Sequence, residues 1–139
     1  MSEALDTLYA HYREGDNQFR IAGGEEGCMK LANDFYDQME MLPEARRILL
    51  LHPGNLTESR RKLGLFLCGY LNGPERYEEE YGPIQLAPAH AHIPIGTAEK
   101  EAWLFCMEKA LERQSYPQEF KDFILKRLSL PAERCRTRP

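Results

Sequence analysis

The sequence predicts an all-α fold within a single domain of 139 residues. Apolar side chains recur at spacings of three and four residues, which places them on one face of a helix. No segment shows the strict alternation of a half-buried strand, and glycine and proline residues divide the chain into helix-sized lengths. A chain of this size buries about two thirds of the surface that its unfolded form exposes. This is enough for a core with an enclosed apolar pocket.

The first part of the chain predicts three helices. Residues 3–13 favour a short helix. A longer one of about four turns follows Gly23 and Gly24 and ends before Pro43, and residues 44–51 favour a short third helix. The buried stripe of the long helix consists of Cys28, Leu31, Ala32, Phe35, Tyr36 and Met39. The local spacing of apolar, glycine and proline residues therefore predicts each of these helices.

A second long helix is predicted from Thr57, taken as its N-cap, to the break at Gly73-Pro74. Residues 75–82 favour one or two further turns. The apolar stripe of the long helix consists of Leu63, Phe66, Leu67, Tyr70 and Leu71.

Residues 83–94 interrupt the helical pattern with three prolines and hold only about one turn of helix. An irregular segment of this length inside a helical domain usually has a functional role. Helix resumes at Thr97, and Pro117 begins the last helix. The inner face of the helix from Thr97 consists of Ala102, Trp103, Cys106, Met107 and Ala110.

Composition excludes several classes of function. The net charge of −4, from 18 basic and 22 acidic residues, gives no basis for binding nucleic acid or an anionic membrane. No apolar run approaches a membrane span, and the first residues lack the apolar core of a secretory signal, so we expect a cytoplasmic protein. The four cysteines lie far apart without a CxxC pair, which argues against structural zinc and against a disulfide framework.

Three residue types in apolar surroundings are candidates for chemistry. His90 lies in the irregular segment, where it is either a hydrogen-bonded histidine of the core or surface, or a ligand of haem iron. A zinc site with His92 lacks a third ligand nearby. Tyr36 and Trp103 either pack in the core or, with His52, donate hydrogen bonds to a polar ligand. Nucleotide-binding and hydrolase motifs are absent from the sequence.

An ordered set of motifs over residues 20–115 resembles the group II truncated haemoglobins. These motifs are Gly23-Gly24-Glu25-Glu26-Gly27, Phe35-Tyr36, Leu42-Pro43-Glu44-Ala45, His52-Pro53, Leu56-Thr57-Glu58-Ser59, Gly69-Tyr70-Leu71-Asn72-Gly73-Pro74, Tyr81-Gly82, His90, Pro94-Ile95-Gly96 and Glu101-Ala102-Trp103-Leu104-Phe105-Cys106-Met107. The resemblance implies a two-over-two helical sandwich, the globin fold of this family, around haem b. It also implies a partly helical N-terminal extension over 1–20, a globin domain over 21–131 and a flexible tail over 132–139.

The resemblance assigns roles to individual residues. It implies that His90 is the proximal iron ligand, and that Tyr36, His52 and Trp103 donate hydrogen bonds to a ligand on the distal side. The implied haem pocket consists of Phe35, Ser59, Lys62, Leu63, Phe66, Leu86, Ile95 and Met107. Ala89 departs from the family, which often has arginine there, so Lys62 becomes the candidate partner of a haem propionate.

Three functions follow from this site. The first is tight binding of oxygen or another diatomic ligand, such as carbon monoxide or nitric oxide, at ferrous iron. The second is a redox enzyme of the peroxidase or nitric oxide dioxygenase type. It would use peroxide or nitric oxide, and its dioxygenase form would need an external reductase because the chain has no flavin or nicotinamide domain. The third is a haem-free helical interaction module. A homodimer is compatible with each of them.

Overall fold

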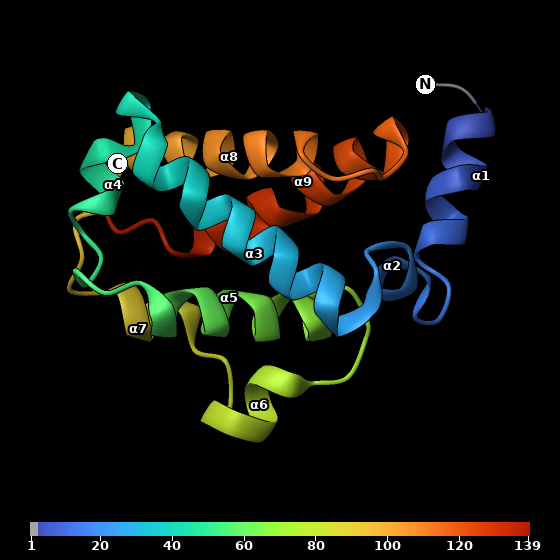
Figure 1. Ribbon diagram of the computed structural model, residues 1–139, viewed down its shortest axis with the longest axis horizontal. Helices are drawn as coiled ribbons and strands as arrows, with labels where there is room; N and C mark the ends of the chain where they lie inside the picture. The colour runs from blue at the N-terminus through green and yellow to red at the C-terminus, as the bar shows by residue number, and fades with distance from the viewer. Residues whose placement is uncertain (1–2) are drawn as a thin grey trace.

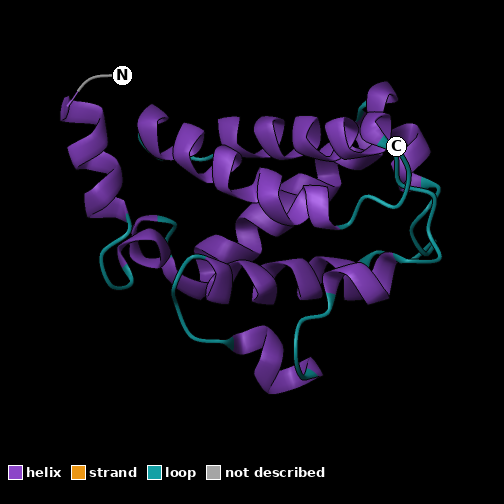
Figure 2. Cartoon of the chain, turned by 180° about the vertical axis from the view of Figure 1, so that it is seen from behind, coloured by secondary structure: helices purple, strands orange, loops and turns teal. Residues whose placement is uncertain are grey.

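The computed structural model describes residues 3–139, and every regular element in that range is a helix, as predicted (Figures 1 and 2). The helices are α1 (Glu3–Tyr12), α2 (Asn17–Ile21), α3 (Gly24–Met41), the 3-10 helix η1 (Pro43–Ala45), α4 (Arg46–Leu49), α5 (Thr57–Tyr70), α6 (Arg76–Tyr81), α7 (Leu86–His90), α8 (Thr97–Glu112) and α9 (Gln118–Arg134). All predicted helices are present. The short helix α2 was not predicted.

Two pairs of long helices make up the fold (Figure 1). Helix α3 crosses α5, helix α8 runs along α9, and α3 also contacts α8, so that the two pairs share one core. This arrangement confirms the predicted two-over-two sandwich. Among the described residues, no helix is both long and apolar enough to cross a membrane.

Helix α3 begins where two glycines reverse the chain after α2. Gly23 and Gly24 have φ angles of 99° and 71°, in the left-handed region that favours glycine. Glu25 and Glu26 then lie in the first turn, where the partial positive charge of the helix stabilises them. The helix spans 18 residues, longer than predicted, and the whole predicted apolar stripe is buried.

The start of α5 corrects one prediction. Thr57 is the first residue of the helix and not its N-cap. The Oδ1 atom of Asn55 accepts a hydrogen bond from the Thr57 amide at 2.9 Å. Asparagine readily bonds the backbone two residues onward, so Asn55 satisfies this free amide from outside the helix.

The N-terminal segment packs on the last helix. The ring of Tyr9 lies 5.0 Å from that of Phe123, and the ring of Tyr12 lies 5.2 Å from that of Phe120. Residues 1 and 2 of the predicted extension lie outside the described range, and its limits stay a prediction. Cys28, Cys68 and Cys106 are buried free thiols, as expected.

We predict that Gly27→Ala lowers the free energy of unfolding by about 1–3 kcal/mol, because overpacking forces the backbone to move. A Cβ at this position would lie 1.8 Å from the Ala22 carbonyl oxygen, which also accepts the Tyr116 hydroxyl at 2.8 Å. Urea unfolding measures the loss. Gly54→Ala is the matched control, since its Cβ would meet nothing within 4 Å. Equal losses in the two variants would contradict the close approach of α2 and α3.

Candidate functional site

The structure brings the three predicted distal residues into one aromatic cluster. Tyr36 on α3 lies edge-on to His52, with ring centroids 5.6 Å apart. Phe35, also on α3, lies 4.9 Å from Tyr36 on one side and 4.9 Å from Trp103 of α8 on the other. Phe35 is fully buried and therefore joins the two ends of the cluster. We refer to Phe35, Tyr36, His52 and Trp103 as the aromatic cluster.

The Tyr36 hydroxyl stays protonated at neutral pH. Burial raises its pKa to about 12, while the positive charge of Arg60 acts weakly in the opposite direction. Among the described residues, no hydrogen bond engages this hydroxyl or the Trp103 indole nitrogen. Each group thus brings one donor that no other described side chain uses.

Arg60 is a site residue that sequence reasoning missed. From α5 it donates to the Asn33 backbone oxygen at 2.9 Å and pairs with Asp37 and Glu40 at 2.9 and 2.8 Å. Its guanidinium carbon lies 5.9 Å from the centre of the Tyr36 ring. These partners are 20 or more positions away in the chain, so no local spacing indicates them. Arg60 holds α5 against α3 at the level of the aromatic cluster.

His52 uses one ring nitrogen for its own backbone. Its Nδ1 lies 2.8 Å from the Ile48 carbonyl oxygen, which can only accept a hydrogen bond. The hydrogen of a neutral His52 is therefore on Nδ1, and Nε2 carries a lone pair. In this form Nε2 accepts a hydrogen bond and donates none. It becomes a donor only when the imidazole is protonated.

His90 ends the short helix α7 and is half-buried. Its Nδ1 lies 2.7 Å from the Leu86 carbonyl oxygen, which places the hydrogen on Nδ1 and leaves the Nε2 lone pair for another partner. Metal-binding histidines commonly donate their second nitrogen in this way. His92 is exposed, and the described residues contain no cluster of three metal-ligating side chains.

The predicted pocket residues differ in burial. Met107 is fully buried in the core, whereas Leu63, Phe66, Leu86 and Ile95 are half-buried apolar side chains. These four side chains come from α5, α7 and the segment before α8. Apolar surface in this state suits contact with a large flat apolar group. Within residues 3–139, no hydrogen bond or ring contact joins His90 to the aromatic cluster.

The two predicted polar pocket residues on α5 have different surroundings. Ser59 is half-buried, and Lys62 is exposed with its Nζ 5.1 Å from the centre of the Tyr81 ring. The Tyr81 hydroxyl in turn donates to Glu58. Lys62 is thus a long, flexible cation at the edge of the site, in contact with a ring on α6.

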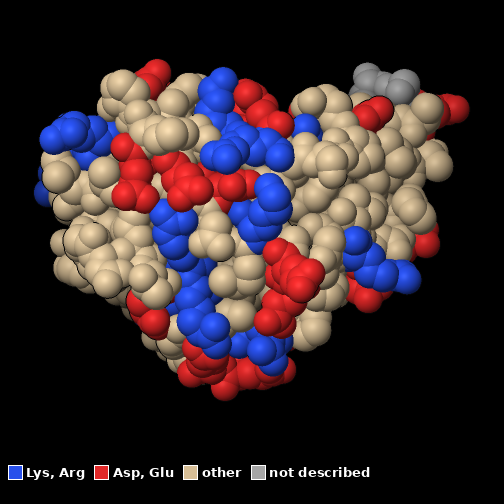
Figure 3. All heavy atoms as spheres, in the orientation of Figure 1, with Lys and Arg blue, Asp and Glu red and all other residues tan. Residues whose placement is uncertain are grey.

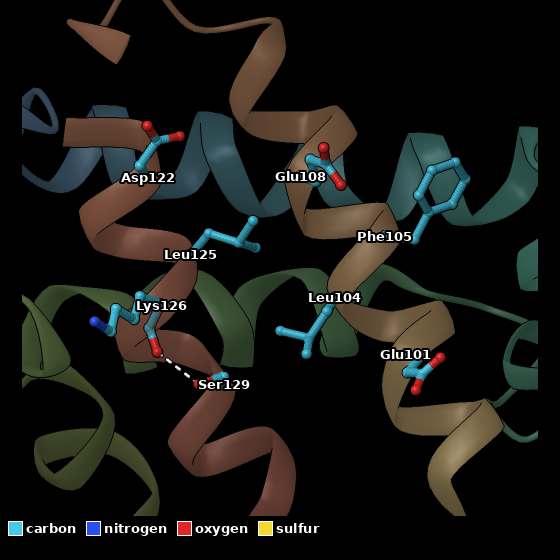
Figure 4. Close-up of a pocket in the computed structure, with 8 residues that line it drawn as sticks. All are labelled: Glu101, Leu104, Phe105, Glu108, Asp122, Leu125, Lys126 and Ser129. Atoms are coloured by element: carbon cyan, nitrogen blue, oxygen red, sulfur yellow. Dashed lines mark hydrogen bonds between the residues drawn. The ribbon is translucent and has the colours of Figure 1, made fainter. Parts of the chain in front are cut away.

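A surface groove of about 510 Å³ lies away from these residues, between α8 and α9 (Figure 4). It is lined by Glu101, Leu104, Phe105, Glu108, Asp122, Leu125, Lys126 and Ser129, none of which was predicted as a site residue.

The face drawn in Figure 3 interleaves acidic and basic side chains. Pairs such as Arg76 with Glu25, at 3.0 Å, connect neighbouring helices.

The two-over-two sandwich of helices is the fold of a truncated globin. The bacterial-like globin family matches residues 17–135. The chain belongs to this family and, within it, to the group II truncated haemoglobins.

Known relatives agree over most of the chain. The group 2 truncated haemoglobin YjbI of Bacillus subtilis is 37% identical over 109 residues, which cover 78% of this chain and 80% of that protein. The group II 2-on-2 haemoglobin of Agrobacterium tumefaciens superposes with a TM-score of 0.82 at 31% identity, covering 88% and 95% of the two chains. A truncated oxygen-avid haemoglobin from Bacillus subtilis gives 0.75 at 34% identity, covering 86% and 98%.

We predict that Tyr36 makes stability depend on pH above 10. Its pKa of about 12 in the folded protein exceeds the value of 10.0 for a free tyrosine. Below pH 10 both states keep the proton. Between pH 10 and 12 only the unfolded chain releases it, so stability falls by up to about 2 kcal/mol.

The measurement is urea unfolding of the wild type and of Tyr36→Phe at pH 8, 10, 11 and 12. The phenylalanine variant lacks this ionisation but keeps all other titrating groups. Its stability relative to the wild type should therefore improve through that window. A constant difference from pH 8 to 12 would show that Tyr36 is not desolvated.

Proposed function

We propose that the chain binds haem b through Nε2 of His90 and holds oxygen, or another diatomic ligand, near Tyr36 and Trp103. The hydrogen bond from His90 Nδ1 to the Leu86 carbonyl is the observation that carries this proposal. It selects the tautomer that an iron ligand needs and restrains the plane of the ring. The family to which the chain belongs implies a haem cofactor.

When bound, haem supplies an iron atom with one coordination position for the protein and one for a small ligand. The protein contributes the apolar surroundings. Leu63, Phe66, Leu86 and Ile95 would cover the porphyrin and exclude water, and in the same arrangement Phe35 and Met107 would support these side chains from the core. Ser59, a small residue, would leave space beside the ligand, and Lys62 would pair with a propionate from the edge.

The donors of the aromatic cluster would stabilise a bound ligand that carries partial negative charge. Among the described residues, nothing engages the single donor of Tyr36 or that of Trp103. A neutral His52 would add no donor, since its Nδ1 hydrogen is committed to Ile48, whereas a protonated His52 would add a third from Nε2. Hydrogen bonds to charged groups contribute about 1.5–3 kcal/mol each. Two donors would therefore slow release of the ligand by orders of magnitude.

This assignment favours retention of oxygen over its ready delivery. One haemoglobin of similar structure, from Bacillus subtilis, is described as oxygen-avid. The two proteins share 34% of their residues in the superposition. The likeness supports tight binding as the proposed property of this chain.

The role of His90 is tested by His90→Gly, read from ferrous and ferric visible spectra. We expect this variant to lose its axial imidazole coordination and to regain it when free imidazole is added in excess. His92→Gly is the matched control, because His92 is exposed two residues onward, and its spectra should equal those of the wild type. A His90→Gly variant with unaltered spectra would overturn the proposal.

The donor roles are tested by the rate of oxygen release, measured by stopped flow. Tyr36→Phe and Trp103→Phe should each accelerate release by about tenfold or more, since each removes one charge-assisted bond. Release of carbon monoxide, which carries less negative charge, should change less. Tyr77→Phe on α6 serves as the control and should leave both rates unchanged. Unchanged oxygen release in both site variants would rule out the donor model.

A further inference from the structure

The segment between His90 and α8 has few partners of its own. Residues 91–96 include Pro94, which has no amide hydrogen, and they form no regular helix. Within the segment, the Ile93 amide donates to the His90 carbonyl at 2.9 Å. The carbonyl of Ile93 and the amide and carbonyl of Ile95 need hydrogen-bond partners from elsewhere in the chain.

The end of the chain supplies those partners. The Thr137 hydroxyl donates to the Ile93 carbonyl at 2.6 Å and accepts from the Ile95 amide at 2.9 Å. The amides of Thr137 and Arg138 donate to the Ile95 carbonyl at 2.8 and 3.0 Å. One hydroxyl thus uses its donor and its acceptor on the two residues that flank Pro94. In Figure 1 the C-terminal tail returns toward the segment between α7 and α8.

Ion pairs fix the tail in this position. Glu133, at the end of α9, pairs with Lys100 of α8 at 2.7 Å and with Arg136 of the tail at 2.7 Å. Glu99 bonds the Gly96 amide at 2.7 Å and pairs with Arg47 of α4 at 3.2 Å. The tail, the first turn of α8 and the segment 91–96 are therefore held together by several polar contacts. The flexibility expected for residues 132–139 stays a prediction.

We propose that Thr137 is a positioning residue for His90. Its hydroxyl hydrogen-bonds the backbone of Ile93 and of Ile95, and the Ile93 amide in turn donates to the His90 carbonyl. This role rests on the proposed function of His90 as the iron ligand. The chain of contacts runs from the Thr137 hydroxyl to the Ile93 carbonyl, and from the Ile93 amide to the His90 carbonyl. It fixes the backbone from the C-terminal side, while the Leu86 carbonyl fixes the ring from the N-terminal side.

The test compares Thr137→Val, which keeps the shape but removes the hydroxyl, with Thr137→Ser, which keeps the hydroxyl. The first measurement is hydrogen exchange of the Ile93 amide in the haem-loaded protein. Thr137→Val should accelerate it about threefold, since an exposed hydrogen bond contributes modestly against water. Thr137→Ser and the control Thr7→Val, on the exposed face of α1, should exchange like the wild type.

The second measurement is the iron–imidazole stretching frequency of the ferrous protein by resonance Raman spectroscopy. It should shift in Thr137→Val and return to the wild-type value in Thr137→Ser. A loss of stability alone would not move this frequency, so the readout separates positioning from general support of the fold.

Any of three results would overturn the proposal. The first is unchanged exchange in Thr137→Val, and the second is faster exchange with an unshifted frequency. The third is equal defects in Thr137→Val and Thr137→Ser, because the hydroxyl would then be irrelevant. Failure of the proposed function looks different. In that case His90→Gly keeps its axial coordination, whereas Thr137→Val still accelerates exchange at Ile93.

Discussion

The burial of helix α3 on two sides is the constraint on which the site depends. Successive residues of a helix point about 100° apart, so neighbours such as Phe35 and Tyr36 serve different faces. Phe35 reaches Trp103 of α8, and Tyr36 reaches His52 and the guanidinium of Arg60 on α5. The same contacts that bury α3 therefore place a phenol and an indole in one cluster. A shift of α3 by one residue would remove Phe35 and Tyr36 from it.

The two site histidines show why local geometry does not define a role by itself. His52 and His90 each use Nδ1 to bond the carbonyl four residues earlier, and no described residue bonds Nε2 of either ring. Their surroundings separate them. The ring of His52 lies edge-on to the Tyr36 ring, within the aromatic cluster. His90 has no such neighbour in the described chain, and its lone pair suits a metal.

Sequence reasoning found the parts of the fold that depend on neighbours in the chain. The long helices follow from apolar spacing because their buried stripes span several turns. The five residues of α2 are too few to show a period. The N-cap of α5 is Leu56, whose side chain offers no capping hydrogen bond, and Asn55 bonds the Thr57 amide from outside the helix. Residue type alone therefore did not locate the start of this helix. Motif order, and not periodicity, made His90 and Trp103 candidates for the site, since spacing cannot separate a core side chain from a ligand. Arg60 and Thr137 were missed because their partners are 20 to 44 residues away.

Under the proposed function, different parts of the chain would position the residues on the proximal and on the distal side of the haem. On the proximal side, Pro88 fits α7 only because the first turn of a helix leaves its amides unbonded, and Pro94 prevents further helix after His90. The backbone of segment 91–96 therefore needs hydrogen-bond partners from outside the segment, and the C-terminal tail provides them. The proposed distal side depends on α3 and on Arg60, and no polar contact among the described residues joins the tail to either. Under the proposed function, substitutions in the tail and substitutions at Arg60 would therefore act separately, the first on the axial bond and the second on ligand retention.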